Sequence, residues 1–220
     1  MHNQEIKAIF FDLDGTLIDS LKIWEEIDYK FLSELKLVEP ENMKSEIEGL
    51  SFEQTAVYFK RKFNLTMSVE EIIQSWFRQV EDAYHNHIEV ISGAYQILDY
   101  FYSSSIQLIL LTSNRRDLVD AILNRLLLGK YFPHRHYNSH KERPQTYQEL
   151  IARYKIKPEQ AWMIDDALAT LLAAKQTGLK TAWTVIGKTD KQHELNKHRH
   201  PDYVDFIVHN SLDELKSLVT

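Results

Sequence analysis

The stretch IFFDLDGTLID at residues 9–19 decides the fold that we expect of this chain. A mainly apolar run from Ile6 to Phe11 ends abruptly at Asp12, and a second carboxylate, Asp14, follows two residues later. An apolar run with polar boundaries is typical of a strand that is buried on both faces of a parallel sheet. Because the ligand crevice of such a sheet lies outside the carboxyl ends of its strands, we expect both carboxylates there.

The two-residue spacing of Asp12 and Asp14 suggests that both carboxylates take part in one site. Residues two apart on a strand lie on one face of the sheet, so Asp12 and Asp14 would be close together and their like charges would need neutralising. A divalent cation does this, and hard carboxylate oxygens suit Mg²⁺. The alternative interpretation is an exposed acidic turn after a buried strand.

Composition narrows the class of protein. The 220 residues correspond to one or two domains and are enough to bury a sizeable core. Cysteine is absent, which excludes disulfides and thiol catalysis and fits the reducing cytoplasm. The N-terminus lacks the apolar region of a secretory signal, and no apolar run approaches the ~18 residues that span a bilayer. The net charge of −6 argues against a nucleic acid as partner, and the lack of a long apolar run argues against a membrane. We expect a monomer or a dimer.

The order of predicted elements changes twice along the chain. Residues 19–91 are helical in period, with an aromatic stripe that we expect to form the core of an inserted helical domain. The stripe consists of Phe52, Phe59, Phe63 and Trp76. Residues 1–18 and 92–220 alternate strands with helices, which predicts a doubly wound α/β core with a parallel sheet. The two linkers are expected at residues 17–20 and 87–93, where Gly93 offers a permissive backbone.

Polar side chains also follow two later apolar runs. Residues 106–111 end in Thr112-Ser113-Asn114, where a hydroxyl and backbone N–H groups at a helix start suit phosphate oxygens. Residues 161–164 end in Asp165-Asp166. An ordinary helix N-cap is the alternative interpretation of the first site. An acidic N-cap for the helix that follows the second site is compatible with a functional role of Asp165 and Asp166. Arg115 follows the first site directly, either to contact a substrate or to lie in solvent.

The DLDGT stretch at residues 12–16 resembles the first motif, DxDGT, of the haloacid dehalogenase (HAD) superfamily. The resemblance implies a Rossmann-like core with a helical cap, as in its phosphoglycolate phosphatase and β-phosphoglucomutase branch. It also implies that the first strand is central, between the strands that end in Thr112 and Asp166. Most members are phosphatases that use Mg²⁺ and pass through an aspartyl-phosphate.

The same resemblance assigns roles to residues. Asp12 would be the nucleophile, and Asp14 the general acid and base whose backbone carbonyl also faces the metal. Thr112 would bind the phosphate with Ser113 and Asn114. Lys141 matches the third-motif lysine, which neutralises Asp12 and the phosphate, with Arg143 as the alternative. Asp166 would be a metal ligand, with Asp165 a second ligand or an orienting group.

Four positions that depart from the family pattern bear on function. Glu142 replaces the proline that usually follows the lysine, and Thr170 stands where a further acid is usual. Trp24 and Phe52 stand where β-phosphoglucomutases have a cap histidine and an arginine. We therefore expect a phosphatase of a small phosphorylated metabolite, with Phe52 in substrate contact. The alternatives are a phosphosugar mutase and a non-catalytic protein that binds a phosphorylated ligand. Two clusters of histidines show no spacing typical of metal ligands. They comprise His134, His136, His140, His193, His198 and His200.

Overall fold

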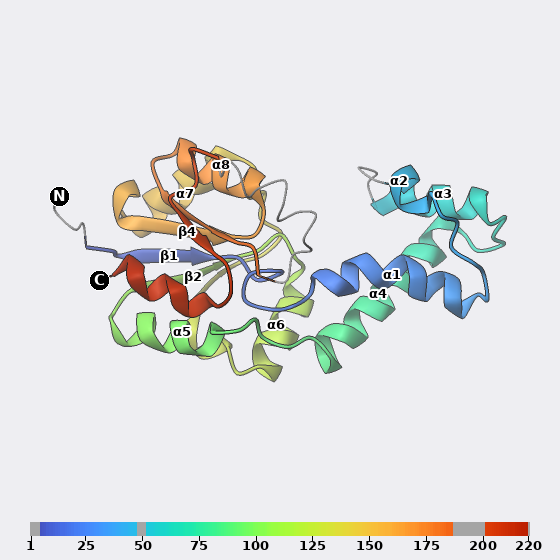
Figure 1. Cartoon of the computed structure of the whole chain (residues 1–220), viewed down its shortest axis with the longest axis horizontal. Helices are drawn as coiled ribbons and strands as arrows, with labels where there is room; N and C mark the ends of the chain where they lie inside the picture. The colour runs from blue at the N-terminus through green and yellow to red at the C-terminus, as the bar shows by residue number, and fades with distance from the viewer. Residues whose placement is uncertain (1–4, 48–51, 187–200, 220) are drawn as a thin grey trace. The chain divides into compact units, whose positions relative to one another are not determined.

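The computed structural model describes residues 5–47, 52–186 and 201–219. The chain divides into two compact units (Figure 1). One unit is formed by residues 1–20 and 88–220, and the other by residues 21–87. The divisions lie after Ser20 and after His87, a few residues from the positions 18 and 91 that the sequence suggested.

The first unit is built on a six-stranded parallel sheet, as predicted. Its strands lie in the order β3-β2-β1-β4-β5-β6. In chain order they are β1 (Ala8–Phe11), β2 (Gln107–Leu111), β3 (His134–His136), β4 (Ala161–Asp165), β5 (Lys180–Thr184) and β6 (Phe206–Val208). The predicted central place of the first strand is confirmed, because β1 pairs with β2 on one side and with β4 on the other.

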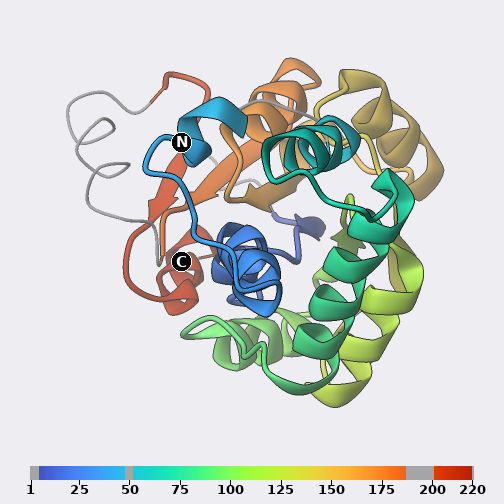
Figure 2. The same ribbon diagram turned by 90° about the vertical axis from the view of Figure 1, so that its right-hand side faces the viewer.

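Helices cover both faces of the sheet. Alternate side chains of β1 point to opposite faces. Phe10 packs in a core cluster with residues of α7 (Pro144–Tyr154) and α8 (Leu168–Gln176). The Phe11 ring lies 6.4 Å from that of Phe101 in α5 (Ala94–Ser103). In Figure 2, α7 and α8 lie above the strands, and α5 lies below them. The remaining helical elements of this unit are α6 (Arg116–Arg125) and the 3₁₀ helices η1 (Gly129–Tyr131), η2 (Pro158–Gln160) and η3 (Leu212–Leu218).

The last helical element of the described part is the 3₁₀ helix η3. Ser211 is its N-cap residue and forms a capping box with Glu214. Gly93 explains part of its close packing, since a Cβ there would lie 2.3 Å from the Ser211 hydroxyl oxygen. Gly93 also has a φ of 81°, so both space and backbone conformation require glycine.

The two linkers pair with each other. The Asp19 N–H donates to the Glu89 carbonyl at 2.9 Å, and the Ile91 N–H donates to the Leu17 carbonyl at 2.9 Å. Ile18 and Val90 accordingly form an antiparallel bridge. The chain therefore leaves and re-enters the first unit through one short hydrogen-bonded ladder.

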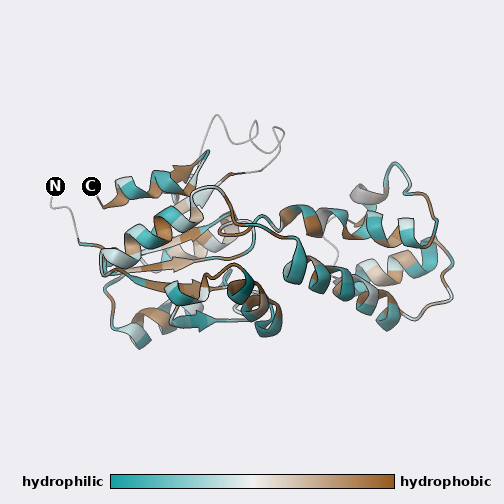
Figure 3. Cartoon of the chain, turned by 90° about the horizontal axis from the view of Figure 1, so that it is seen from below, coloured by the Kyte–Doolittle hydropathy of each residue, from teal (hydrophilic) through white to brown (hydrophobic). Residues whose placement is uncertain are grey.

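The second unit is entirely helical in its described part, namely residues 21–47 and 52–87. Its helices are α1 (Leu21–Glu34), α2 (Met43–Ile47), α3 (Phe52–Lys62) and α4 (Val69–Asn86). Phe59 and Trp76 of the predicted stripe are fully buried, with ring centroids 5.3 Å apart, and the Phe63 ring lies 5.5 Å from that of Phe59. Brown and teal residues alternate along these helices in Figure 3, as amphipathic packing requires. The side chains of Phe52 and Trp24 lie outside the described part.

Candidate active site

Three strand ends bring the predicted residues of the first unit together. Asp12 follows β1 directly, and its N–H still donates to the Ile164 carbonyl of β4 at 3.0 Å. Thr112 follows β2, while Asp165 is the last residue of β4. Because β1 lies between β2 and β4, the carboxyl ends of neighbouring strands place these side chains at one edge of the sheet.

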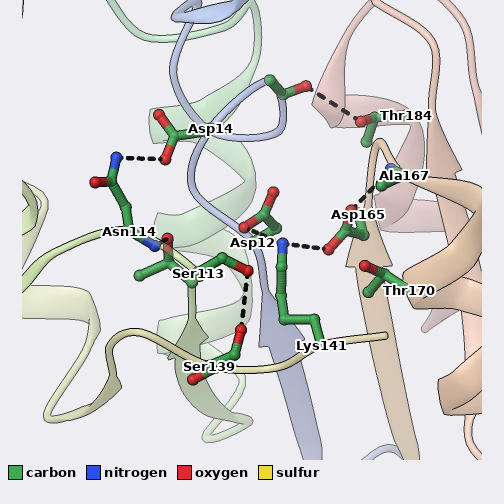
Figure 4. A network of polar contacts seen from close by, with 12 residues as sticks. Asp12, Asp14, Ser113, Asn114, Ser139, Lys141, Asp165, Ala167, Thr170 and Thr184 are labelled. Carbon is green, nitrogen blue, oxygen red and sulfur yellow. Dashed lines mark hydrogen bonds and ion pairs between the residues drawn. The ribbon is translucent and has the colours of Figure 1, made fainter. Parts of the chain in front are cut away.

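Lys141 lies between two of the carboxylates (Figure 4). Its Nζ is 2.5 Å from Asp12 Oδ1 and donates to Asp165 Oδ2 at 2.7 Å. All three side chains are buried. The predicted lysine thus lies beside the predicted nucleophile. Arg143, the alternative, has its Nε 3.4 Å from Glu142 in an exposed pair.

Burial and charge act against each other in this trio. Burial and the neighbouring Asp165 raise the pKa of Asp12, and the Lys141 ammonium opposes that rise. Burial, with Asp166 nearby, likewise raises the pKa of Asp165. Burial alone would disfavour the Lys141 ammonium, but its two carboxylate partners prevail and raise its pKa. One ammonium therefore leaves the carboxylates of this site incompletely neutralised.

The acidic side chains suit a hard cation. Carboxylate oxygens of Asp12, Asp165 and Asp166 lie within 4.8 Å of one another. Among residues 5–47, 52–186 and 201–219, no other group of three His, Cys, Asp or Glu side chains could hold a metal ion. An all-oxygen donor set with excess negative charge fits Mg²⁺.

Asp14 is placed differently from the expectation. The strand ends at Phe11, so Asp12 and Asp14 do not share one face of a strand. The Asp14 carboxylate points towards Asn114 in Figure 4, accepting from Asn114 Nδ2 at 3.1 Å and from Ser20 Oγ at 2.7 Å. The sequence did not reveal these two donors, since Asn114 is 100 residues away and Ser20 reads as the start of a helix.

The loop after β2 also differs from its simplest interpretation. Thr112 does not cap α6, whose N-cap residue is Arg115. The buried Thr112 hydroxyl instead accepts from the Asn114 N–H at 3.0 Å, and Ser113 Oγ donates to the Ser139 carbonyl at 2.9 Å. The Arg115 guanidinium contacts Asp117 at 2.8 Å. The loop is thus tied to the segment that precedes Lys141.

The remaining candidates contribute less to this arrangement. Thr170 is buried and brings no carboxylate to the cluster, while its backbone carbonyl lies 3.5 Å from the Tyr147 hydroxyl. His136 contacts the Tyr154 hydroxyl at 2.8 Å, and His140 lies 3.5 Å from Glu142. The histidines at 193, 198 and 200 lie outside the described residues, as does the Phe52 side chain.

Comparison with known proteins identifies the family. The family described as haloacid dehalogenase-like hydrolase matches residues 9–184, which include every strand-end residue named above. The chain belongs to this family. The resemblance inferred from the DLDGT stretch is confirmed, and the chain is an HAD-like hydrolase.

Two relatives and one solved structure show how far the similarity extends. The glyceraldehyde 3-phosphate phosphatase of Pyrococcus furiosus is 25% identical over 91% of this chain and 89% of its own length. The pyrophosphatase PpaX of Bacillus velezensis is 28% identical, covering 85% of this chain and 88% of its own. A Thermotoga maritima protein provisionally named β-phosphoglucomutase has a TM-score of 0.81 at 21% identity, covering 96% of this chain and 99% of its own. The last comparison confirms the fold of this HAD-like hydrolase.

None of the helices in the described ranges has both the length and the apolar character needed to cross a bilayer.

Proposed function

We propose that this HAD-like hydrolase is a Mg²⁺-dependent phosphatase that hydrolyses a small phosphorylated metabolite through an aspartyl-phosphate on Asp12. The observation that carries the proposal is the position of Lys141, whose ammonium lies between Asp12 and Asp165 at the end of the central strand. A buried ammonium beside a buried carboxylate attracts a phosphate dianion to the place where that carboxylate can attack.

The chemistry divides into two steps. In the first, an oxygen of Asp12 forms a bond to phosphorus, the ester P–O bond breaks, and Asp14 gives a proton to the leaving oxygen. In the second, Asp14 takes a proton from water, whose oxygen attacks the same phosphorus and releases Asp12. Ser20 and Asn114 hold the Asp14 carboxylate in place. The Thr112 hydroxyl, which follows β2, is the proposed hydrogen-bond donor to the phosphate. Ser113 and Asn114 of the same loop are the other proposed phosphate contacts.

The carboxylates of Asp12, Asp165 and Asp166, with the Asp14 backbone carbonyl, are the proposed Mg²⁺ ligands. Bound there, Mg²⁺ offsets the negative charge that the acidic groups and the phosphate bring together. Lys141, whose ammonium lies between Asp12 and Asp165, supplies the other compensating charge.

The substrate class follows from the same residues and from the relatives. A single phosphate site beside one lysine suits a small phosphate ester, and both curated relatives carry phosphatase or pyrophosphatase names. Phe52 and Arg115 remain the proposed substrate contacts. We expect a cytoplasmic enzyme that acts as a monomer or dimer, with no nucleic acid and no membrane as partner.

Two alternatives lead to different measurements. A phosphosugar mutase of the β-phosphoglucomutase type is favoured by the fold likeness but opposed by Trp24 and Phe52 at the positions of the cap histidine and arginine. A non-catalytic protein that binds a phosphorylated ligand is favoured by Thr170 and Glu142 and opposed by the paired Asp12 and Lys141.

Purified protein tested on a panel of phosphorylated metabolites and an aryl phosphate separates these functions. We expect release of inorganic phosphate with Mg²⁺ and its loss in EDTA. Conversion between sugar 1- and 6-phosphates without phosphate release would favour the mutase. Tight binding of a phosphorylated ligand with no turnover of any substrate would favour the non-catalytic protein. Undiminished turnover in EDTA would contradict the metal assignment.

A further inference from the structure

Asp166 is held through its backbone by a residue of the next strand. The Trp183 indole Nε1 donates a hydrogen bond to the Asp166 carbonyl oxygen at 2.9 Å. Trp183 lies on β5 directly beside Asp165 in the register of β4 and β5. Its side chain is buried in the core cluster with Met163 and Leu171, so the indole donor has a fixed position.

The loop that carries Asp166 lacks the usual anchor of a helix start. The N-cap residue of α8 is Ala167, which has no side-chain oxygen to accept from the first turn. Asp165 takes over part of this role, since its Oδ1 accepts from the Ala167 N–H at 2.8 Å (Figure 4). Asp165 holds the loop at Ala167, and Trp183 holds it at the carbonyl of Asp166.

A cation bound at this carboxylate cluster would depend strongly on the loop that carries Asp166. Asp12 and Asp165 are buried and already engaged by Lys141, whereas Asp166 is the partly exposed member of the carboxylate cluster. Thr170 supplies no further carboxylate. A tilt of the peptide after Asp166 would turn its side chain away from the other two, because the peptide plane and the side chain share one Cα.

We propose that Trp183 is a positioning residue for the metal site, which fixes the Asp166 carboxylate through its indole hydrogen bond. This inference rests on the proposed function, because it assigns the cation to the Asp12, Asp165 and Asp166 cluster. Trp183 contributes no ligand atom itself and acts only through Asp166.

The chain contains a matched control for this hydrogen bond. Trp162 lies on β4 and is also buried, but its indole Nε1 has no hydrogen-bond partner within the described part of the chain. Trp183→Phe and Trp162→Phe therefore each remove one buried indole and keep an aromatic ring. Only the first removes a hydrogen bond.

Metal binding is measured without substrate, from the loss of the free-ion electron paramagnetic resonance signal of Mn²⁺, a cation of the same ligand preference, with Mg²⁺ as competitor. We expect Trp183→Phe to raise the dissociation constant about two- to ten-fold, the effect of one lost hydrogen bond. Trp162→Phe should change it by less than about two-fold. The concentration of Mg²⁺ for half-maximal turnover should shift in parallel, while the substrate KM at saturating Mg²⁺ stays unchanged.

A second variant guards against a purely structural effect. Adding Ala167→Ser to Trp183→Phe supplies an N-cap hydroxyl for α8, so metal affinity should recover in part. Equal affinity of Trp183→Phe and Trp162→Phe would overturn the inference and leave the proposed function intact. A wild-type protein that binds neither Mn²⁺ nor Mg²⁺ would overturn both. A Trp183→Phe protein that loses its fold would overturn the inference as well, because the main role of Trp183 would then be to stabilise the hydrophobic core.

Discussion

The two units of the chain use buried side chains for different purposes. The sheet unit buries charged groups at strand ends, and each of Asp12, Lys141 and Asp165 is paired. In the described part of the helical unit, the largest fully buried side chains are aromatic, and the Trp76 ring packs against those of Phe31 and Phe59. Burying a charge is costly unless a partner compensates it, whereas burying an aromatic ring stabilises a fold directly. The sheet unit therefore reveals the chemistry, and the helical unit reveals only its own packing.

The largest effect expected from this contrast is that of Asp12→Asn. An amide of nearly the same shape keeps the packing but cannot act as the nucleophile, so turnover should fall by a factor of about a thousand or more. The measurement is phosphate release from an aryl phosphate, with circular dichroism to verify the fold. Asp19→Asn, an exposed change in the same loop, is the control and should stay active. Hydrolysis by Asp12→Asn at the wild-type rate would remove the basis of the mechanism.

Lys141→Met tests whether the buried charges of the sheet unit depend on one ammonium. Removing one partner of a buried ion pair costs about 3–5 kcal/mol, so both the free energy of unfolding and turnover should fall. Urea denaturation and steady-state kinetics measure the two. Arg143→Met is the control, because its guanidinium is exposed and lies 3.4 Å from Glu142 in an exposed pair. Should Arg143→Met prove the more damaging variant, the lysine role would pass to Arg143.

The contrast also explains what the sequence could and could not predict. The apolar run before Asp12 predicted β1, and the resemblance of residues 12–16 to the HAD motif implied its central place between the strands that end in Thr112 and Asp166. The strand itself depends on a local pattern, whereas its place in the sheet depends on the family resemblance. The hydrogen bonds that Ser20 donates to Asp14 and that Trp183 donates to Asp166 follow no local sequence pattern. Their donors are side chains that serve equally well as a helix start or a core residue. The turn of the backbone after Phe11 likewise overrode the two-residue spacing of Asp12 and Asp14.

Within the helical unit, Phe59→Ala and Phe52→Ala form a matched pair. Phe59 is fully buried against Trp76, so its truncation should cost about 3–5 kcal/mol. Hydrogen exchange should then show lost protection in α3 and α4 but not in β1 and β2. Phe52→Ala should change the relative rates across phosphate esters with a smaller loss of stability. A drop of several degrees in the melting temperature of Phe52→Ala with unchanged relative rates would make Phe52 a structural residue.

The smallest expected effect on stability is that of a change at Glu214. This carboxylate belongs to the sheet unit, but it lies in the capping box of η3, away from the strand ends that carry the site. Burial acts to raise its pKa, but hydrogen bonds from the backbone N–H groups of His209, Asn210 and Ser211 prevail and lower it. A depressed carboxyl pKa stabilises the fold above the unfolded pKa of about 4.3 and loses this effect as the pH falls through the folded value. Glu214→Gln should thus cost about 1 kcal/mol at pH 7 and progressively less below about pH 4. Urea denaturation of both proteins at pH 7 and below about pH 4 tests this prediction. An equal loss in the free energy of unfolding at the two pH values would contradict it.

The central claim is that Asp12 carries the phosphoryl group during turnover, and chemical trapping tests it most directly. Borohydride added during steady-state hydrolysis reduces an acyl phosphate to the alcohol, which peptide mass spectrometry locates as homoserine. We predict homoserine at position 12 that appears only when substrate and Mg²⁺ are both present. Steady turnover with position 12 unmodified, or homoserine at position 14 or 165 instead, would contradict the account.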